Sequence, residues 1–181
     1  MAVKNGKKDS GFSLIELIIV IAIMAVLVGV LAPQYLKYVE RSRNAVDLQN
    51  AKAIIDAVNV YYVDPERKSE PKTPTVKNKV DIIVVTSSGA SANDKFSYEA
   101  ITNAGLVTLN TQTINGAILG YLSESFTCKS RSRWTGYKIQ YQLKQEQLVF
   151  SVVLSGVKSE LKPDVTAQWK NALSISGVTY Q

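Results

Sequence analysis

The chain has 181 residues, a formal net charge of +6, one cysteine and no histidine. The lack of histidine excludes a Ser–His–Asp triad, a histidine metal site and a histidine general base, and a single cysteine excludes an internal disulfide. There is also no phosphate-binding loop of the GxxxxGK type. The sequence therefore indicates a structural or binding protein rather than an enzyme, with no cofactor and no metal site.

The N-terminal segment joins a short polar stretch to a long apolar one. Residues 1–11 are basic and rich in small polar side chains, whereas residues 12–32 are apolar except for Ser13 and Glu16. As a helix, the apolar stretch would be roughly 31 Å long, close to the ~30 Å hydrocarbon core of a bilayer. We therefore expect a helix that can span a membrane.

Three interpretations of this apolar segment are open. A cleaved secretory signal would be unusually long, and its cut after Ala32 would place Pro33 beside the cut, which is a poor fit. An unprocessed anchor lacks an orientation signal, because lysines and arginines flank both ends of the segment. Neither explains Glu16, since a carboxylate costs about 2.5–3.5 kcal/mol at the centre of a membrane helix and less near its end.

The third interpretation is a cut after Gly11, which gives Glu16 a partner. Phe12 would acquire a free α-amino group, which is largely protonated at neutral pH. Residues four apart share one face of a helix, so the amine and the carboxylate could pair within one chain. They could equally pair between neighbouring chains, and a buried pair of that kind would fix the axial register of those chains.

The run from Gly11 to Glu16 (GFSLIE) resembles the processing motif of type IV prepilins. That motif has a glycine before the cut, an apolar aromatic residue after it, and glutamate at the fifth mature position. Pro33 falls at mature position 22, where many type IV pilins carry a proline. The resemblance covers roughly residues 1–50, and the rest of the chain is not matched residue by residue.

The resemblance implies a specific life cycle. A prepilin peptidase would cut between Gly11 and Phe12 and methylate the amine of Phe12. An assembly ATPase and a platform protein would then move the subunit from membrane lipid into a helical homopolymer, where Glu16 compensates the Phe12 amine of an adjacent subunit. The protein would be single-pass in the cytoplasmic (inner) membrane before assembly and extracellular in the pilus filament afterwards.

The purpose of such a filament is left open among adhesion, twitching motility and DNA uptake. One alternative is a pseudopilin of a type II secretion or competence machine, which carries the same N-terminal signature. A second alternative, from another class, is a membrane-anchored binding module that is never processed. Surface filaments would favour the first function, and an intact N-terminus would favour the last.

We expect one long helix from Phe12 to Tyr62, ended by Asp64-Pro65. Pro33 lacks an N–H and crowds the carbonyl of Gly29, so these two residues predict a break in the helix, although Pro33 could instead mark the membrane exit. Beyond it, apolar residues recur at helical spacing and predict a stripe that packs on a sheet. The stripe consists of Ala51, Ile54 or Ile55, Val58, and Tyr61 or Tyr62.

The expected fold class is α+β, a long N-terminal helix packed on an antiparallel β-sheet head. We divide the chain into a leader (1–11), a transmembrane or filament-core helix (12–33), its amphipathic half (34–62) and a β-rich head (63–181). In the head, the patterns predict a strand at 81–86, a loop at 87–94 and a helix at 96–103. They further predict a hairpin of 137–144 with 148–154, a helix from 163 towards 169 and a strand at 174–179.

Three cations alternate at Lys129, Arg131 and Arg133, next to Trp134 and Tyr137. In an extended chain they would share one face, and basic residues beside aromatic ones suit single-stranded nucleic acid, by phosphate attraction and stacking. We favour the alternative, a solvated face or contacts with acidic patches of neighbouring subunits. Cys128, just before this run, is expected to be a buried or inert thiol.

Overall fold

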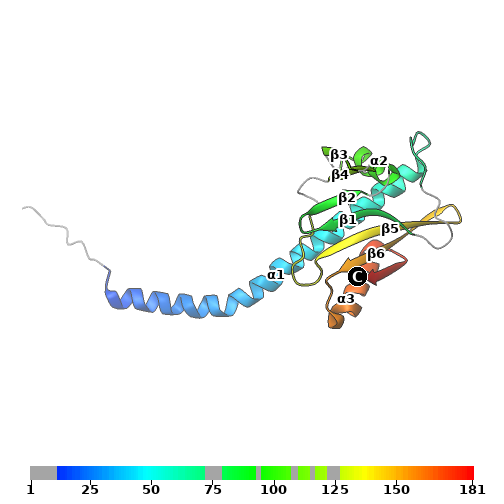
Figure 1. Ribbon diagram of the computed structural model, residues 1–181. Helices are drawn as coiled ribbons and strands as arrows, with labels where there is room; N and C mark the ends of the chain where they lie inside the picture. Colours follow the sequence, from blue (N-terminus) through cyan, green and yellow to red (C-terminus); the bar gives the residue numbers. More distant parts are fainter. Residues whose placement is uncertain (1–11, 72–78, 93–94, 107–109, 115–116, 122–126) are drawn as a thin grey trace, which may run out of the picture. The chain divides into compact units, whose positions relative to one another are not determined.

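The computed structural model describes residues 12–71, 79–92, 95–106, 110–114, 117–121 and 127–181. The protein has two compact units, with the boundary between Val39 and Glu40. The first unit is the N-terminal part of one helix, and the second contains the remainder of that helix and all the strands (Figure 1).

Helix α1 spans Leu14–Val63, within two residues of the predicted bounds. It contains Pro33 and is continuous there, so the predicted break at Gly29 and Pro33 stays a prediction. At its end, the backbone N–H of Glu66 donates to the Asp64 carboxylate at 2.8 Å, which stabilises the turn that follows the helix.

The second unit is built on a seven-stranded sheet in the order β3-β4-β2-β1-β5-β6-β7. The strands are β1 (Val80–Thr86), β2 (Gly89–Ala92), β3 (Asn110–Ile114), β4 (Ala117–Tyr121), β5 (Gly136–Lys144), β6 (Gln147–Ser155) and β7 (Gly177–Tyr180). The helices are α2 (Lys95–Asn103) and α3 (Lys162–Leu173), with a short 3₁₀ turn at Ser159–Leu161.

The sheet is antiparallel, as predicted, except at one edge. Strands β6 and β7 pair in parallel, whereas the other pairs are antiparallel. The reason is the connection, because α3 carries the chain back to the starting end of β6 before β7 begins, and such a crossover produces parallel neighbours. The α+β class itself is confirmed.

The predicted loop at 87–94 is also wrong in part, since Gly89–Ala92 forms β2. Small residues such as Gly, Ala and Ser are poor strand formers, so the sequence gives no strand signal there. The strand is stabilised by its hydrogen bonds to β1 and not by its own propensity. The chain turns back after two residues, and Gly89 of β2 pairs with Thr86 of β1. Strands β3 and β4 were not predicted.

The hairpin of β5 and β6 is confirmed, together with its turn. Gln145 and Glu146 both have positive φ, at 48° and 61°, which is the backbone that a two-residue hairpin turn favours. Across the pair, Tyr137 faces Leu154 and Ile139 faces Val152. All four side chains are buried, which gives the sheet one apolar face.

The three helices meet that apolar face. The stripe of α1 is buried except for Tyr62, which is half-buried. Phe96 of α2 contacts Tyr141 of β5 at a ring-centroid distance of 6.0 Å, and Trp169 of α3 contacts Tyr137 at 5.3 Å. The core therefore lies between the sheet and the second half of α1, with α2 and α3 covering the ends of this layer (Figure 1).

Candidate functional site

Phe12 lies two residues before the start of α1 and Glu16 lies in its first turn, whereas Gly11 lies outside the described residues. Ser13 immediately precedes the helix, and the Glu16 carboxylate Oε2 accepts the backbone N–H of Ser13 at 2.9 Å. This is one of the two hydrogen bonds of a capping box. In that motif, a glutamate three residues after the N-cap residue, here Ser13, accepts the free backbone N–H of the N-cap residue. The S-x-x-E spacing was visible in the sequence, but this role for Glu16 was missed.

The first unit exposes an apolar surface on all sides. Phe12 is 86% exposed, Leu14 75% and Leu31 59%. The other large apolar side chains between them are exposed as well: Ile15, Leu17, Ile18, Ile19, Val20, Ile21, Ile23, Met24, Val26, Leu27, Val28 and Val30. Such a surface needs lipid or other chains to cover it, and α1 is long and apolar enough to span a membrane.

In the second unit, the loop 127–135 is bound to α1 by the buried carboxylate of Asp47. Oδ1 accepts the backbone N–H of Lys129 at 2.7 Å. Oδ2 accepts the backbone N–H of Ser130 and the indole N–H of Trp134, both at 2.9 Å, and the thiol of Cys128 lies 3.5 Å away. A carboxylate removed from water is tolerated when its oxygens are satisfied in this way.

Two helical turns earlier, Glu40 binds the same loop further along. Its Oε1 accepts the backbone N–H groups of Arg131 and Ser132, both at 2.8 Å, and the hydroxyl of Ser130 at 3.1 Å. Partial burial would raise the pKa of Glu40, but these hydrogen bonds outweigh it and lower the pKa to about 2. Its Oε2 lies 3.6 Å from a guanidinium nitrogen of Arg43.

We call Glu40, Asp47 and the loop 127–135 the carboxylate clamp. Both acids lie on the face of α1 that continues the buried stripe, since Asp47 precedes Ala51 by four residues. The clamp was not predicted from the sequence, because Glu40 and Asp47 resemble ordinary surface charges there. The sequence does hold one indication of the clamp, because Asp47 lies at a position of the apolar stripe. A carboxylate that is buried with the stripe needs hydrogen-bond donors around it.

The clamp also sets the state of the cysteine. Cys128 is 8% exposed, as the sequence predicted for a buried thiol. Burial, followed by the negative charge of Asp47, raises the pKa of Cys128 to about 12. Tyr137 lies near the same carboxylate, and burial together with Asp47 raises the pKa of its hydroxyl well above 10.

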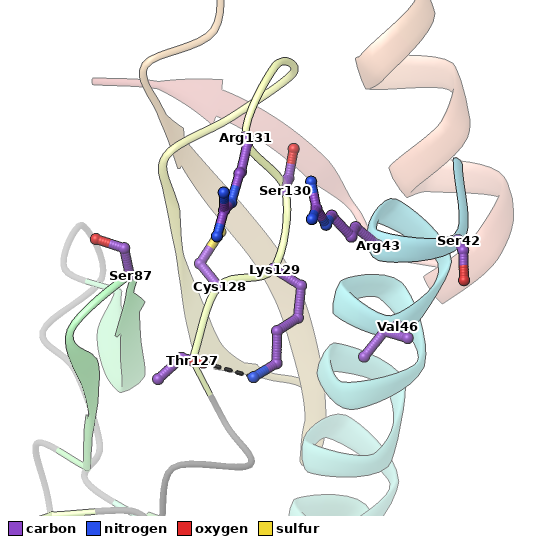
Figure 2. A pocket seen from close by; sticks show the side chains of 9 residues that line it. All are labelled: Ser42, Arg43, Val46, Ser87, Thr127, Cys128, Lys129, Ser130 and Arg131. Atoms are coloured by element: carbon purple, nitrogen blue, oxygen red, sulfur yellow. Dashed lines mark hydrogen bonds between the residues drawn. The ribbon is translucent and has the colours of Figure 1, made fainter. Parts of the chain in front are cut away.

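The three alternating cations do not share an extended face, because residues 131–133 form bends rather than a strand. The Arg133 guanidinium donates to the side-chain oxygen of Gln168 in α3 at 3.0 Å. Lys129 and Arg131 instead line a surface cavity beside α1 (Figure 2). Trp134 is 1% exposed, so its ring is closed to stacking on a base.

Within the described part of the chain, no group of three or more acidic or cysteine side chains is placed to hold a metal ion.

Comparisons with known proteins agree with the features of the first unit. Residues 6–32 match the family described as the prokaryotic N-terminal methylation motif. The chain is 33% identical over 63 residues to the "Type IV major pilin protein PilA" of Myxococcus xanthus, an alignment that covers 35% of this chain and 29% of that protein. The chain thus spans less than a third of this relative's length. It matches no solved structure.

These comparisons confirm the motif and the distant similarity to a type IV pilin that the residues from Gly11 to Glu16 indicated. Both matches are to a class of structural proteins and not to enzymes, as expected from the composition.

Proposed function

We propose that this prepilin-like chain is the precursor of a structural subunit of a type IV pilus-like filament, cut between Gly11 and Phe12 and methylated on the Phe12 amine. One observation carries the proposal: the methylation motif at residues 6–32 includes the first turns of α1, and the large apolar side chains of that part of the helix are exposed on every side. A helix of this kind is stable only within a membrane or within the core of an assembly.

The same helix surface suits both environments in turn. Before assembly, lipid acyl chains would cover the exposed side chains of the first unit. In a homopolymer, the equivalent helices of neighbouring subunits would replace the acyl chains, so that moving from lipid to filament leaves no apolar surface in water. The subunit would therefore be single-pass in the cytoplasmic (inner) membrane first and extracellular later, with an assembly ATPase and a platform protein driving the transfer.

The position of Glu16 supports the proposed charge pairing. Its Oε2 bonds the backbone N–H of Ser13, the residue next to Phe12. Cutting before Phe12 would therefore create a cationic amine one residue before Ser13, whose N–H the Glu16 carboxylate already accepts. Its other oxygen, Oε1, would be left for the amine of an adjacent subunit, so that one acid could cap its own helix and set the register with a neighbour.

N-terminal sequencing with mass spectrometry, applied to the protein from its native host, tests the proposal. We expect a chain that begins with N-methylphenylalanine at Phe12. A protein that still begins at Met1 would instead favour an unprocessed membrane-anchored module. Electron microscopy of the same cells then separates a pilus, which gives surface filaments, from a pseudopilin that is processed without forming them.

A further inference from the structure

A groove between α1 and α2 is a feature of the second unit that the proposed function does not use. It has a volume of about 390 Å³ and lies between the last turns of α1 and the C-terminal end of α2. Most of its lining is apolar: Ala53, Ala57, Val60, Ala100, Ala104 and Leu106. Val60 is 68% exposed, so the floor of this groove is open to an apolar partner.

The charged side chains that line the groove are both acidic. Asp56 lies on α1 and is exposed, whereas Asp64 directly follows the helix and is half-buried. Oδ1 of Asp64 accepts the backbone N–H of Glu66 at 2.8 Å. Within the part of the chain that the structure describes, neither Asp56 nor Asp64 forms an ion pair.

The charges around the groove leave it negative overall. They are four cations and three acids: Lys52, Arg67, Lys68, Lys95, Glu66, Glu70 and Glu99. Lys95 lies 3.8 Å from Glu99, and Arg67 lies 2.9 Å from Glu70, so four of these seven residues are already paired. When Asp56 and Asp64 are included, the acids outnumber the cations by one. The groove therefore suits a partner that is apolar and positively charged.

Residues 34–43 of α1 have the opposite charge. They contain one acid, Glu40, and three cations: Lys37, Arg41 and Arg43. Glu40 lies 3.6 Å from Arg43 and also accepts backbone N–H groups of its own loop 127–135. Its full charge is counted here, and the segment still carries a net charge of +2.

Lys37 and Arg41 belong to a helix face that matches the groove. Both are exposed and lie four residues apart, so they share one face of α1, and Tyr38 between them is 71% exposed. Among the described residues, neither cation has an ion-pair partner. An aromatic ring beside two cations thus complements an apolar floor beside two acids.

We infer that residues 34–43 of one copy of this chain dock in the groove between α1 and α2 of a second copy. The inference rests on the proposed function, in which the α1 helices of subunits drawn from one membrane pack in parallel. Setting Lys37 of one copy beside Asp56 of the other displaces the two copies by 19 residues. That displacement is roughly 28 Å along the helix axis.

The same displacement brings the other groups of the two surfaces together. Arg41 then lies beside Val60, one helical turn from Asp64, which is within the reach of a long guanidinium side chain. Tyr38 lies beside Ala57, where the small side chain leaves room for the ring. One displacement therefore satisfies the charges and covers the apolar floor.

This contact is distinct from the proposed pairing of Glu16 with the Phe12 amine of an adjacent subunit. That pair joins positions four residues apart, which corresponds to a displacement of only about 6 Å. A displacement of roughly 28 Å involves a subunit further along the filament. Each subunit therefore makes the two contacts with two different neighbours.

The test exchanges the charges of one proposed pair in the native host. Lys37→Asp and Asp56→Lys each place two like charges together, and the double variant restores an opposite pair in the exchanged order. Lys158→Asp and Glu160→Lys are the matched controls, because they make equal charge changes at exposed residues outside the groove. Sheared surface filaments are quantified by immunoblot, and the intact mass in the membrane fraction shows that each variant is made and cut.

We expect each single variant to lower the filament yield by about tenfold or more, because like charges then face each other at every repeat of the polymer. The double variant should return to within about threefold of the original yield, and the controls should stay within about twofold.

Original yield from either single variant would overturn the inference and leave the filament in place. A double variant as poor as the single ones would also overturn it, and would indicate that the groove contacts a different partner. Absence of filaments from the original protein would instead contradict the proposed function, and the inference with it.

Discussion

The buried carboxylate of Asp47 and the buried indole of Trp134 share a 2.9 Å hydrogen bond, although 87 positions separate them in the chain. Trp134 in turn packs edge-on against Trp169 of α3, with ring centroids 5.3 Å apart. One acid of α1 therefore connects the long helix, the loop and the last helix of the second unit. The consequences of this relationship can be measured.

Asp47→Asn should destabilise the second unit by about 3 kcal/mol or more. An amide in place of the carboxylate either turns its NH₂ group towards N–H donors or leaves those donors unsatisfied in the core. Urea unfolding in detergent, followed by the fluorescence of the two buried tryptophans, measures the change. Asp56→Asn is the control, because Asp56 is exposed on the same helix, and it should change the free energy of unfolding by less than about 0.5 kcal/mol. Equal effects of the two substitutions would contradict the role assigned to Asp47.

Glu40 predicts a loss of stability in acid. Its folded-state pKa is lowered from 4.5 to about 2, because the hydrogen bonds from Arg131 and Ser132 outweigh the effect of burial. A lowered acid pKa contributes stability that is fully present above 4.5 and disappears as the pH falls through about 2. The contribution is at most about 3 kcal/mol, and unfolding measured across this pH range should show it.

Glu40→Gln isolates this effect from the other acids. The pKa of Glu99 is lowered as well, since the hydroxyl groups of Ser69 and Tyr61 donate to it and outweigh its burial. The difference in the free energy of unfolding between the original protein and Glu40→Gln should therefore be largest above pH 4.5 and should approach zero near pH 2. A constant difference across this range would mean that the charge of Glu40 is not what the loop recognises.

Much of the fold followed from the sequence, for physical reasons. The long helix, its buried stripe and the β5–β6 hairpin each carry a hydrophobic period over many residues, and such a period determines both the element and its buried face. The parallel edge at β7 and the strand β2 did not follow. Both depend on where a connection returns the chain, and neither Gly89–Ala92 nor Gly177–Tyr180 is apolar enough to reveal its pairing.

The candidate sites divide in the same way. Glu16 stands out in the sequence because a charge within an apolar run is locally anomalous. The clamp stayed hidden, because Glu40 and Asp47 differ from ordinary surface acids only in what the fold places against them. The nucleic-acid hypothesis depended on an extended chain at 129–133 and on exposed aromatic rings, and the loop supplies neither.

The Cys128 thiol should be almost inert in the folded protein. Burial and the charge of Asp47 raise its pKa to about 12, so the reactive thiolate is depleted roughly a thousandfold relative to an ordinary cysteine. Labelling with iodoacetamide at pH 8, followed by mass spectrometry, should be slow in the native protein and fast in urea. Rapid labelling of the native protein would show that the thiol is accessible and that the loop opens readily.

Gly11→Val should block the proposed cleavage, because a branched side chain would stand directly before the bond that the peptidase cuts. Co-expression with a prepilin peptidase, followed by intact-mass measurement of the membrane fraction, reports the result. Gly6→Val is the matched control, since it changes another glycine of the leader away from the cut, and it should be processed normally. A mature chain beginning at Phe12 in the Gly11→Val variant would contradict the proposed cut site.

Glu16 offers the sharpest test, because the structure gives it a capping role that competes with the proposed charge pair. Glu16→Gln keeps an oxygen that can accept the Ser13 N–H but removes the charge, whereas Glu16→Ala removes both. We expect both variants to be cleaved and both to yield few filaments by electron microscopy, because a neutral side chain cannot compensate the Phe12 amine of a neighbour. Full filament yield from Glu16→Gln, with loss only in Glu16→Ala, would make Glu16 a helix cap, and the charge pairing between subunits would have to be abandoned.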